Sequence, residues 1–145
     1  MPRKTDSNNP ADWLFIAASD LAGLNALATQ ELGYEMCRSK VAEVLEKVLK
    51  AELIRLGWPL LKTHDLQVLS NELHVLKSDL LPIAKPLCNA LAEVYFTDRY
   101  PGFDLEEPDW PAFRRQLAEV ASLAEAVQRR VSSSNPKPPK KDGAS

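Results

Sequence analysis

Residues 34–56 read YEMCRSKVAEVLEKVLKAELIRL, and this stretch decides the fold of the chain. Its apolar side chains recur at helical spacing and form one stripe, which comprises Val41, Val44, Leu45, Val48 and Ala51. Glu46 precedes Lys50 by four residues, an acid-before-base pair that we expect on the solvent side of the helix. At about six turns the helix exceeds the average globular length, which indicates the spine of a helical bundle.

Composition bounds the class of protein. The chain has 145 residues, of which 45% are hydrophobic and 26% charged, as in a globular protein with one core. The net charge of -2 gives no whole-chain argument for nucleic-acid binding. No apolar run is long enough to span a bilayer, and we expect no secretory signal and a cytoplasmic location. Cys37 and Cys88 are expected to be buried, reduced thiols, and no metal or cofactor is predicted.

Four further helical patterns follow from the sequence, and three of them begin at capping residues. Asn9 precedes the first, Thr63 the third and Asp109 the last, and each has a side chain that can accept a hydrogen bond from a helix N-terminus. In the first pattern we expect one apolar face made of Trp13, Ile16, Ala17, Leu21, Leu24 and Leu27. The expected helices, besides 34–56, cover about residues 10–31, 63–77, 87–99 and 110–131.

Prolines and glycines punctuate these patterns. Pro82 and Pro86 are expected to break the segment before the fourth helix, because proline removes a backbone donor. Gly33 and Gly57 flank the central helix. Gly23 costs the first helix about 1 kcal/mol relative to alanine, and we expect close packing against a neighbouring helix in return.

The patterns predict an all-α fold, because no run alternates apolar and polar residues as a strand does. We expect an up-and-down antiparallel four-helix bundle with a fifth helix. The predicted domain covers residues 10–131, between a disordered N-terminus at 1–9 and a disordered tail at 132–145 that is rich in Ser, Pro and Lys.

Few residues suit acid–base chemistry. His64 follows the central helix, and we favour a histidine that bonds loop backbone and packs on Trp58 or Leu60 over a catalytic base. His74 is expected on the surface. The acids before the last helix are interpreted as loop acids at a helix N-terminus, and they comprise Asp104, Glu106, Glu107 and Asp109. A solvated arginine face is expected from Arg114, Arg115, Arg129 and Arg130, although these could touch phosphates.

Four sequence runs resemble the HEPN domain family in their order and spacing. They are DWLFIAASDLAGLNALA at 12–28, AEVLEKVLKAEL at 42–53, KTHDL at 62–66 and AEVYFTDRYP at 92–101. The resemblance covers about residues 12–131. It implies an all-helical bundle, usually a homodimer. Many members are RNase toxins, often encoded beside a minimal nucleotidyltransferase antitoxin. Other members are non-catalytic, and nucleotide binding is proposed for the family.

The resemblance also exposes a departure. Nuclease members carry an Arg followed, after four to six residues, by a His, and the Arg of that motif matches Arg99. The expected His falls at Asp104, Leu105 or Glu106, none of which is His. Acids at that position repel phosphate, which argues against catalysis. If the protein is a nuclease, the candidate catalytic residues are His64 as base and Arg99, or an arginine of the last helix, as the group that binds phosphate. The candidate binding residues are Arg99, Tyr100, Tyr95, Arg114 and Arg115.

Three functions stay open from the sequence. The first is a catalytically silent, dimeric binding or regulatory module, in a toxin–antitoxin-like context, whose partner is a nucleotide or a nucleotidyltransferase-type protein. The second is a metal-independent endoribonuclease toxin with a displaced active site. The third is a structural or adaptor dimer without a ligand.

Overall fold

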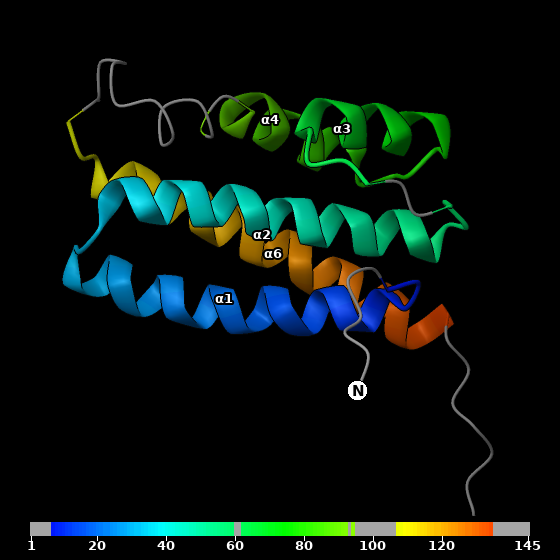
Figure 1. Ribbon diagram of the computed structural model, residues 1–145, viewed down its shortest axis with the longest axis horizontal. Coiled ribbons are helices and arrows are strands. Elements are labelled where there is room, and N and C mark those ends of the chain that lie inside the picture. The colour runs from blue at the N-terminus through cyan, green and yellow to red at the C-terminus, as the bar shows by residue number, and fades with distance from the viewer. Residues whose placement is uncertain (1–6, 60–61, 93, 95–106, 135–145) are drawn as a thin grey trace, which may run out of the picture.

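The computed structural model describes residues 7–59, 62–92, 94 and 107–134. Its helices are α1 (Pro10–Gln30), α2 (Tyr34–Arg55), α3 (Leu66–Val75), α4 (Leu81–Leu91) and α6 (Trp110–Ser134). These described residues contain no strand, and the predicted all-α bundle is confirmed. The long helices α1, α2 and α6 pack together, and the shorter pair α3 and α4 covers α2 on the side away from α1 (Figure 1).

Helix α2 is the centre of the bundle. It packs against all four other described helices, and every residue of the predicted stripe is buried. The expectation that Glu46 and Lys50 lie on a solvent side is wrong, because both side chains are buried. They form an ion pair with Lys50 Nζ 2.9 Å from Glu46 Oε2. The reason is architectural, since α2 is enclosed by neighbours where an isolated amphipathic helix would face water.

Helix α1 begins as predicted but faces the core differently. Asn9 caps it by accepting a hydrogen bond from the Ala11 amide at 3.0 Å. Ile16, expected in the core, is 46% exposed. The buried face comprises Leu14, Ala17, Leu21, Leu24 and Ala28. The expected close packing at Gly23 is also wrong, because a Cβ at this position would meet nothing within 4 Å.

Helices α3 and α4 begin at other residues than predicted. The cap of α3 is Asp65, which accepts from the Gln67 amide at 2.9 Å, so the prediction of Thr63 is wrong. Helix α4 begins at Leu81, and the prediction that prolines break this segment is also wrong. Pro82 lies in the first turn, where no intrahelical donor is needed. Pro86 lies inside the helix, which continues past it to Leu91 although proline supplies no backbone donor.

Helix α6 closes the bundle. Asp109 caps it as predicted, with Oδ1 accepting from the Ala112 amide at 3.0 Å. Its first turn belongs to an aromatic cluster in which the Tyr34 and Trp110 ring centroids are 5.2 Å apart. Ala124 on the same helix is only partly buried. The buried side chains of α6 are Trp110, Phe113, Leu117, Val120, Leu123, Val127 and Val131.

Two further features concern cysteines and membranes. Cys37 and Cys88 are buried free thiols, as predicted. Within the described residues, no helix combines the length and the apolar character that crossing a membrane requires.

Candidate functional site

A surface hollow of about 390 Å³ lies where the C-terminal ends of α2 and α6 meet. Its lining comprises Arg55, Ala126, Arg129, Arg130 and Ser133. Three arginines reach this one place because Arg55 ends α2 while Arg129 and Arg130 are consecutive near the end of α6. Guanidinium groups present several N–H donors in a fixed fork that matches the oxygens of carboxylates and phosphates.

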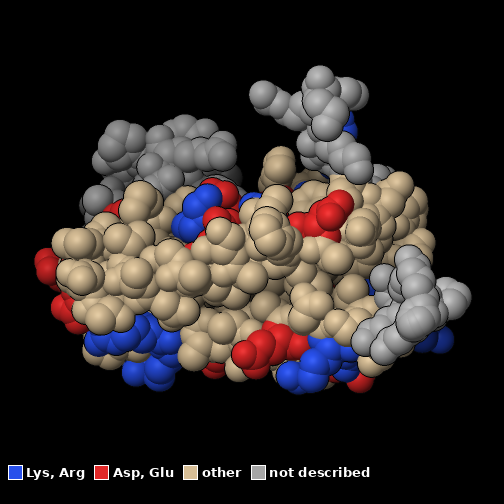
Figure 2. Space-filling model, turned by 90° about the horizontal axis from the view of Figure 1, so that it is seen from below, with Lys and Arg blue, Asp and Glu red and all other residues tan. Residues whose placement is uncertain are grey.

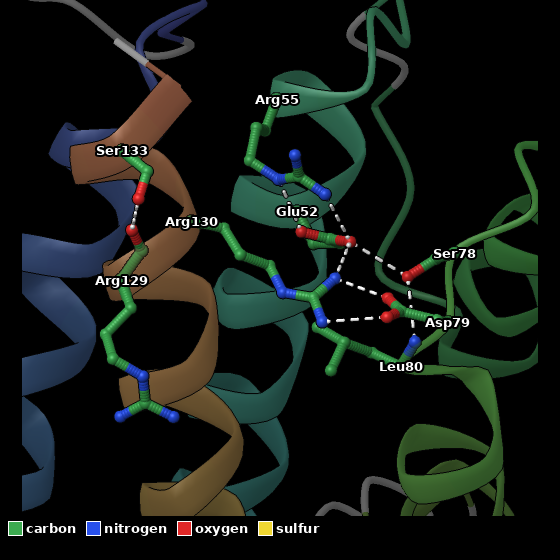
Figure 3. A network of polar contacts seen from close by, with 8 residues as sticks. All are labelled: Glu52, Arg55, Ser78, Asp79, Leu80, Arg129, Arg130 and Ser133. Atoms are coloured by element: carbon green, nitrogen blue, oxygen red, sulfur yellow. Dashed lines mark hydrogen bonds and ion pairs between the residues drawn. The ribbon is translucent and has the colours of Figure 1, made fainter.

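A buried carboxylate organises one side of the hollow. Glu52 is 0% exposed and accepts from Arg55 Nε at 2.8 Å and from Arg55 Nη2 at 3.0 Å. Ser78 Oγ donates to Glu52 Oε2 at 2.8 Å, and Arg130 Nη1 lies 3.5 Å from the same oxygen. The network joins α2, α6 and the turn between α3 and α4 (Figure 3). A buried charge needs such partners, because an unpaired carboxylate without water is strongly destabilising.

A second carboxylate meets Arg130 from the surface. Asp79 accepts from Nη1 and Nη2 of Arg130, the second at 3.1 Å, so the guanidinium is held by both oxygens. The Arg130 hydrogen bond lowers the pKa of Asp79, and the same bond raises the pKa of Arg130. The Asp79 side chain is 75% exposed, whereas Glu52 has no contact with water.

Arg129 is placed differently from its neighbour. Its guanidinium extends away from the Glu52 network and has no hydrogen-bond or ion-pair partner among the residues that the structure describes (Figure 3). Its carbonyl accepts from Ser133 Oγ at 3.0 Å. Among the described residues, Glu52 and Asp79 are the carboxylates that pair with the guanidinium groups of Arg55 and Arg130, and the Arg129 guanidinium adds a third positive charge to the hollow. It carries a surplus positive charge and an available cation, which suits an anionic ligand.

A separate polar cluster lies on another face of α2. His64 Nδ1 is 2.7 Å from Glu46 Oε2, and the same oxygen pairs with Lys50. Lys50 Nζ in turn lies 5.2 Å from the centroid of the Trp13 ring. The imidazole side chain is 81% exposed although the carboxylate behind it is buried. The expected bonding of His64 to loop backbone is therefore replaced by a side-chain contact with α2.

The predicted binding residues do not assemble at the hollow. Arg114 donates to the Ala28 carbonyl at 3.1 Å and pairs with Glu31, so it fastens α6 to the end of α1. Arg115 is exposed on α6 and does not line the hollow, and His74 is exposed on α3 as predicted. Other predicted residues lie outside the described part of the chain, namely Tyr95, Arg99, Tyr100, Asp104, Leu105 and Glu106.

The sequence analysis did not identify four members of the network around the hollow, namely Glu52, Arg55, Ser78 and Asp79. Arg55 and Asp79 carry no motif, and the only local signal was the spacing of Glu52 and Arg55, three residues apart on one helix. The expectation of a solvated arginine face is wrong for Arg130, which pairs with two carboxylates. The contact between Arg130 and Asp79 joins residues 51 positions apart, and no local sequence pattern predicts such a contact.

Comparison with protein families agrees with the fold. The model of the family described as HEPN domain matches residues 10–133. The match covers most of the chain and all five described helices except the last residue of α6. The chain therefore belongs to the HEPN domain family. Searches of the curated proteins and of the solved structures found no match.

Proposed function

We propose that this HEPN domain is a catalytically silent, dimeric module that binds a nucleotide through its phosphates in the arginine hollow. The observation that carries the proposal is the gathering of Arg55, Arg129 and Arg130 at one hollow, with the Arg129 guanidinium available. Phosphate groups are matched by clustered guanidinium donors, and charge-assisted bonds of this kind are about twice as strong as neutral ones.

The argument that the domain is catalytically silent comes from the positions of its two histidines. The sequence has only two, and neither follows an arginine at the spacing of the nuclease motif. His74 is exposed on α3, and the hydrogen-bond partner of His64 is Glu46 on α2. Neither histidine lines the arginine hollow, so a phosphate bound there would have no imidazole from this lining to act as base or acid.

The dimer is supported by the outer face of α1, formed by Phe15, Ser19, Ala22, Gly23 and Ala26. All five residues are exposed, and Phe15 is 77% exposed. A broad uncharged band crosses this side of the molecule, with charged side chains in separate groups around it (Figure 2). A helix that is apolar on both faces is usually buried on both. The exposed face of α1 is therefore a candidate surface for contact with another protein chain.

A second copy of the chain fits that face. A two-fold interface places each residue near its own counterpart, so an uncharged centre avoids like-charge repulsion. The side chains of this face are large at one end, where Phe15 lies, and small at the other end, where Ala26 lies. Antiparallel docking therefore sets the large end of each copy against the small end of the other. A solution mass near 16.1 kDa would contradict the dimer.

The binding proposal is tested by calorimetric titration of the full chain with ATP and, separately, with inorganic tripolyphosphate, which carries no base. We expect both to bind, more weakly at higher salt. Arg129→Ala and Arg130→Ala should each weaken binding at least about tenfold, the equivalent of about 1.4 kcal/mol. Arg115→Ala removes the same charge from an exposed site on the same helix and should leave affinity nearly unchanged. No heat from either probe at millimolar concentration would refute the proposal.

A second candidate function is metal-independent RNA cleavage, favoured by the contact of His64 with Glu46. A carboxylate that accepts from Nδ1–H leaves Nε2 as the ring nitrogen that faces a substrate, and Nε2 is the nitrogen that a general base would use. In this candidate an arginine of α6 or Arg99 would bind the phosphate. An RNA cleavage assay in chelator decides it: His64→Ala should abolish cutting and His74→Ala should not. Intact RNA with the wild type excludes the candidate.

The partner class is a separate proposal. The family context suggests a nucleotidyltransferase-type protein, which co-purification from the native host would reveal. If neither this partner nor a nucleotide binds, the adaptor dimer without a ligand is the reading that remains.

A further inference from the structure

We propose that Asp79 occupies, on Arg130, the position that a ligand phosphate takes, so that the turn between α3 and α4 acts as an internal competitor for the arginine hollow. The inference rests on the proposed phosphate site and assigns its regulation. Both oxygens of Asp79 accept from the Arg130 guanidinium, which is the two-point geometry by which arginine also holds phosphate. In the ligand-free protein one guanidinium that lines the hollow, that of Arg130, is therefore already paired with an anion of the chain itself.

The two carboxylates on Arg130 differ in how easily they can leave. Glu52 is 0% exposed and keeps Arg55 and Ser78 as donors, so its charge is satisfied without Arg130. The Asp79 side chain is 75% exposed and regains water when it separates from the guanidinium. Exposed ion pairs contribute little free energy because water competes for both partners. A phosphate that contacts Arg129 as well as Arg130 makes more charge-assisted hydrogen bonds than Asp79 makes. The phosphate therefore displaces Asp79 from Arg130.

The exchange would alter contacts between helices. Asp79 lies in the turn between α3 and α4, and its pair with Arg130 ties that turn to α6 (Figure 3). The adjacent Ser78 ties the same turn to α2 through Glu52. Ligand binding would break the contact between Asp79 and Arg130 and keep the contact between Ser78 and Glu52. The α3–α4 turn, at the surface of the domain, would therefore change its contacts when the hollow is occupied.

The test compares tripolyphosphate affinity of the wild type and of Asp79→Asn, which keeps the size of the side chain and removes its charge. A site whose competent state is only partly populated binds more weakly by that fraction, so Asp79→Asn should bind about fivefold more tightly. Glu119→Gln, also an exposed acid, on α6 but outside the hollow, makes the same change in net charge and should not alter affinity. Thermal unfolding of each variant checks that the fold is retained, and Asp79→Ala serves as a second variant.

The outcomes separate this inference from the proposed function. If the wild type binds through Arg129 and Arg130 but Asp79→Asn and Asp79→Ala bind no more tightly, the competitor is refuted and the phosphate site stands. If Glu119→Gln gains as much as Asp79→Asn, the effect is net charge alone and the competitor is again refuted. If no variant binds tripolyphosphate, the phosphate site fails and this inference fails with it.

Discussion

Replacing Glu52 with alanine should destabilise the domain far more than removing any exposed acid. Glu52 accepts two bonds from Arg55 and one from Ser78, and it is 0% exposed. Breaking a buried ion pair by deleting one partner costs about 3–5 kcal/mol. The side chains of Arg55 and Arg130 are 19% and 29% exposed and can regain some water, which favours the lower end of that range. We therefore expect a loss of about 3 kcal/mol in the free energy of unfolding.

The assay is urea unfolding followed by far-ultraviolet circular dichroism, together with thermal melts. A loss of about 3 kcal/mol corresponds to a fall in Tm of about 9 °C for a chain of this size. Glu52→Gln keeps an acceptor for Ser78 and should lose about half as much. Glu43→Ala is the control, because Glu43 lies on the same helix with a side chain 36% exposed and pairs with Lys40 and Lys47 at the helix surface. Its effect should stay within about 0.5 kcal/mol. If Glu52→Ala costs no more than Glu43→Ala, the buried network does not hold the helices together and the reasoning is refuted.

Three other predictions concern single groups. Arg130 lowers the pKa of Asp79, so the pair stabilises the fold at pH values above the ordinary Asp pKa of about 3.9. This stabilisation disappears as the pH falls below that value. In acid unfolding, Asp79→Asn should therefore lack the loss of stability that comes from protonation of Asp79. Gly23→Ala should raise the free energy of unfolding of the single chain by about 1 kcal/mol, because a Cβ there meets nothing of its own chain within 4 Å. Gly33→Ala should lower it by about 1 kcal/mol, because φ is +67°. Equal effects in chemical unfolding, measured at a concentration too low for a dimer, would contradict this. Burial raises the pKa of Cys88 to about 12, so a thiol reagent at pH 8 should label it only after denaturation, and rapid labelling of the folded protein would show that the thiol is accessible.

The helices were predictable because their causes are local. The stripe of α2 and the caps at Asn9 and Asp109 depend on residues within a few positions of each other, and all are confirmed. Where two local signals compete, sequence reasoning chose wrongly. Thr63 and Asp65 are both capping residues two positions apart, and only the structure shows that the second one caps.

The errors in burial have a common cause. The periodicity of α1 leaves the direction of its apolar faces open, because residues on both sides are apolar or small, and so Ile16 was placed in the core. In α2 the opposite happened, since Glu46 and Lys50 have the spacing of a surface pair but are enclosed by other helices. Charge pattern predicts exposure only where the neighbouring elements leave room for water.

The candidate site was the least predictable part. Its arginines come from two helices far apart in sequence, and Asp79 comes from a third segment. The family resemblance pointed to Arg99, which lies outside the described residues. Tertiary contacts between Arg130 and Asp79 are encoded by the packing of α6 beside the α3–α4 pair, and no spacing rule within one element predicts them.

The enclosure of α2 has a consequence for how the domain opens. Its amide groups lie beneath four other helices, so fluctuations that detach one neighbour leave it covered by the rest. Amide protons in the middle of α2 should therefore exchange with solvent deuterium only when the whole domain unfolds, and their exchange free energy should equal the global one. The amides of α3 and α4, which cover one side only, should exchange through smaller openings. The helix whose sequence decides the fold would then be the last part of the domain to open.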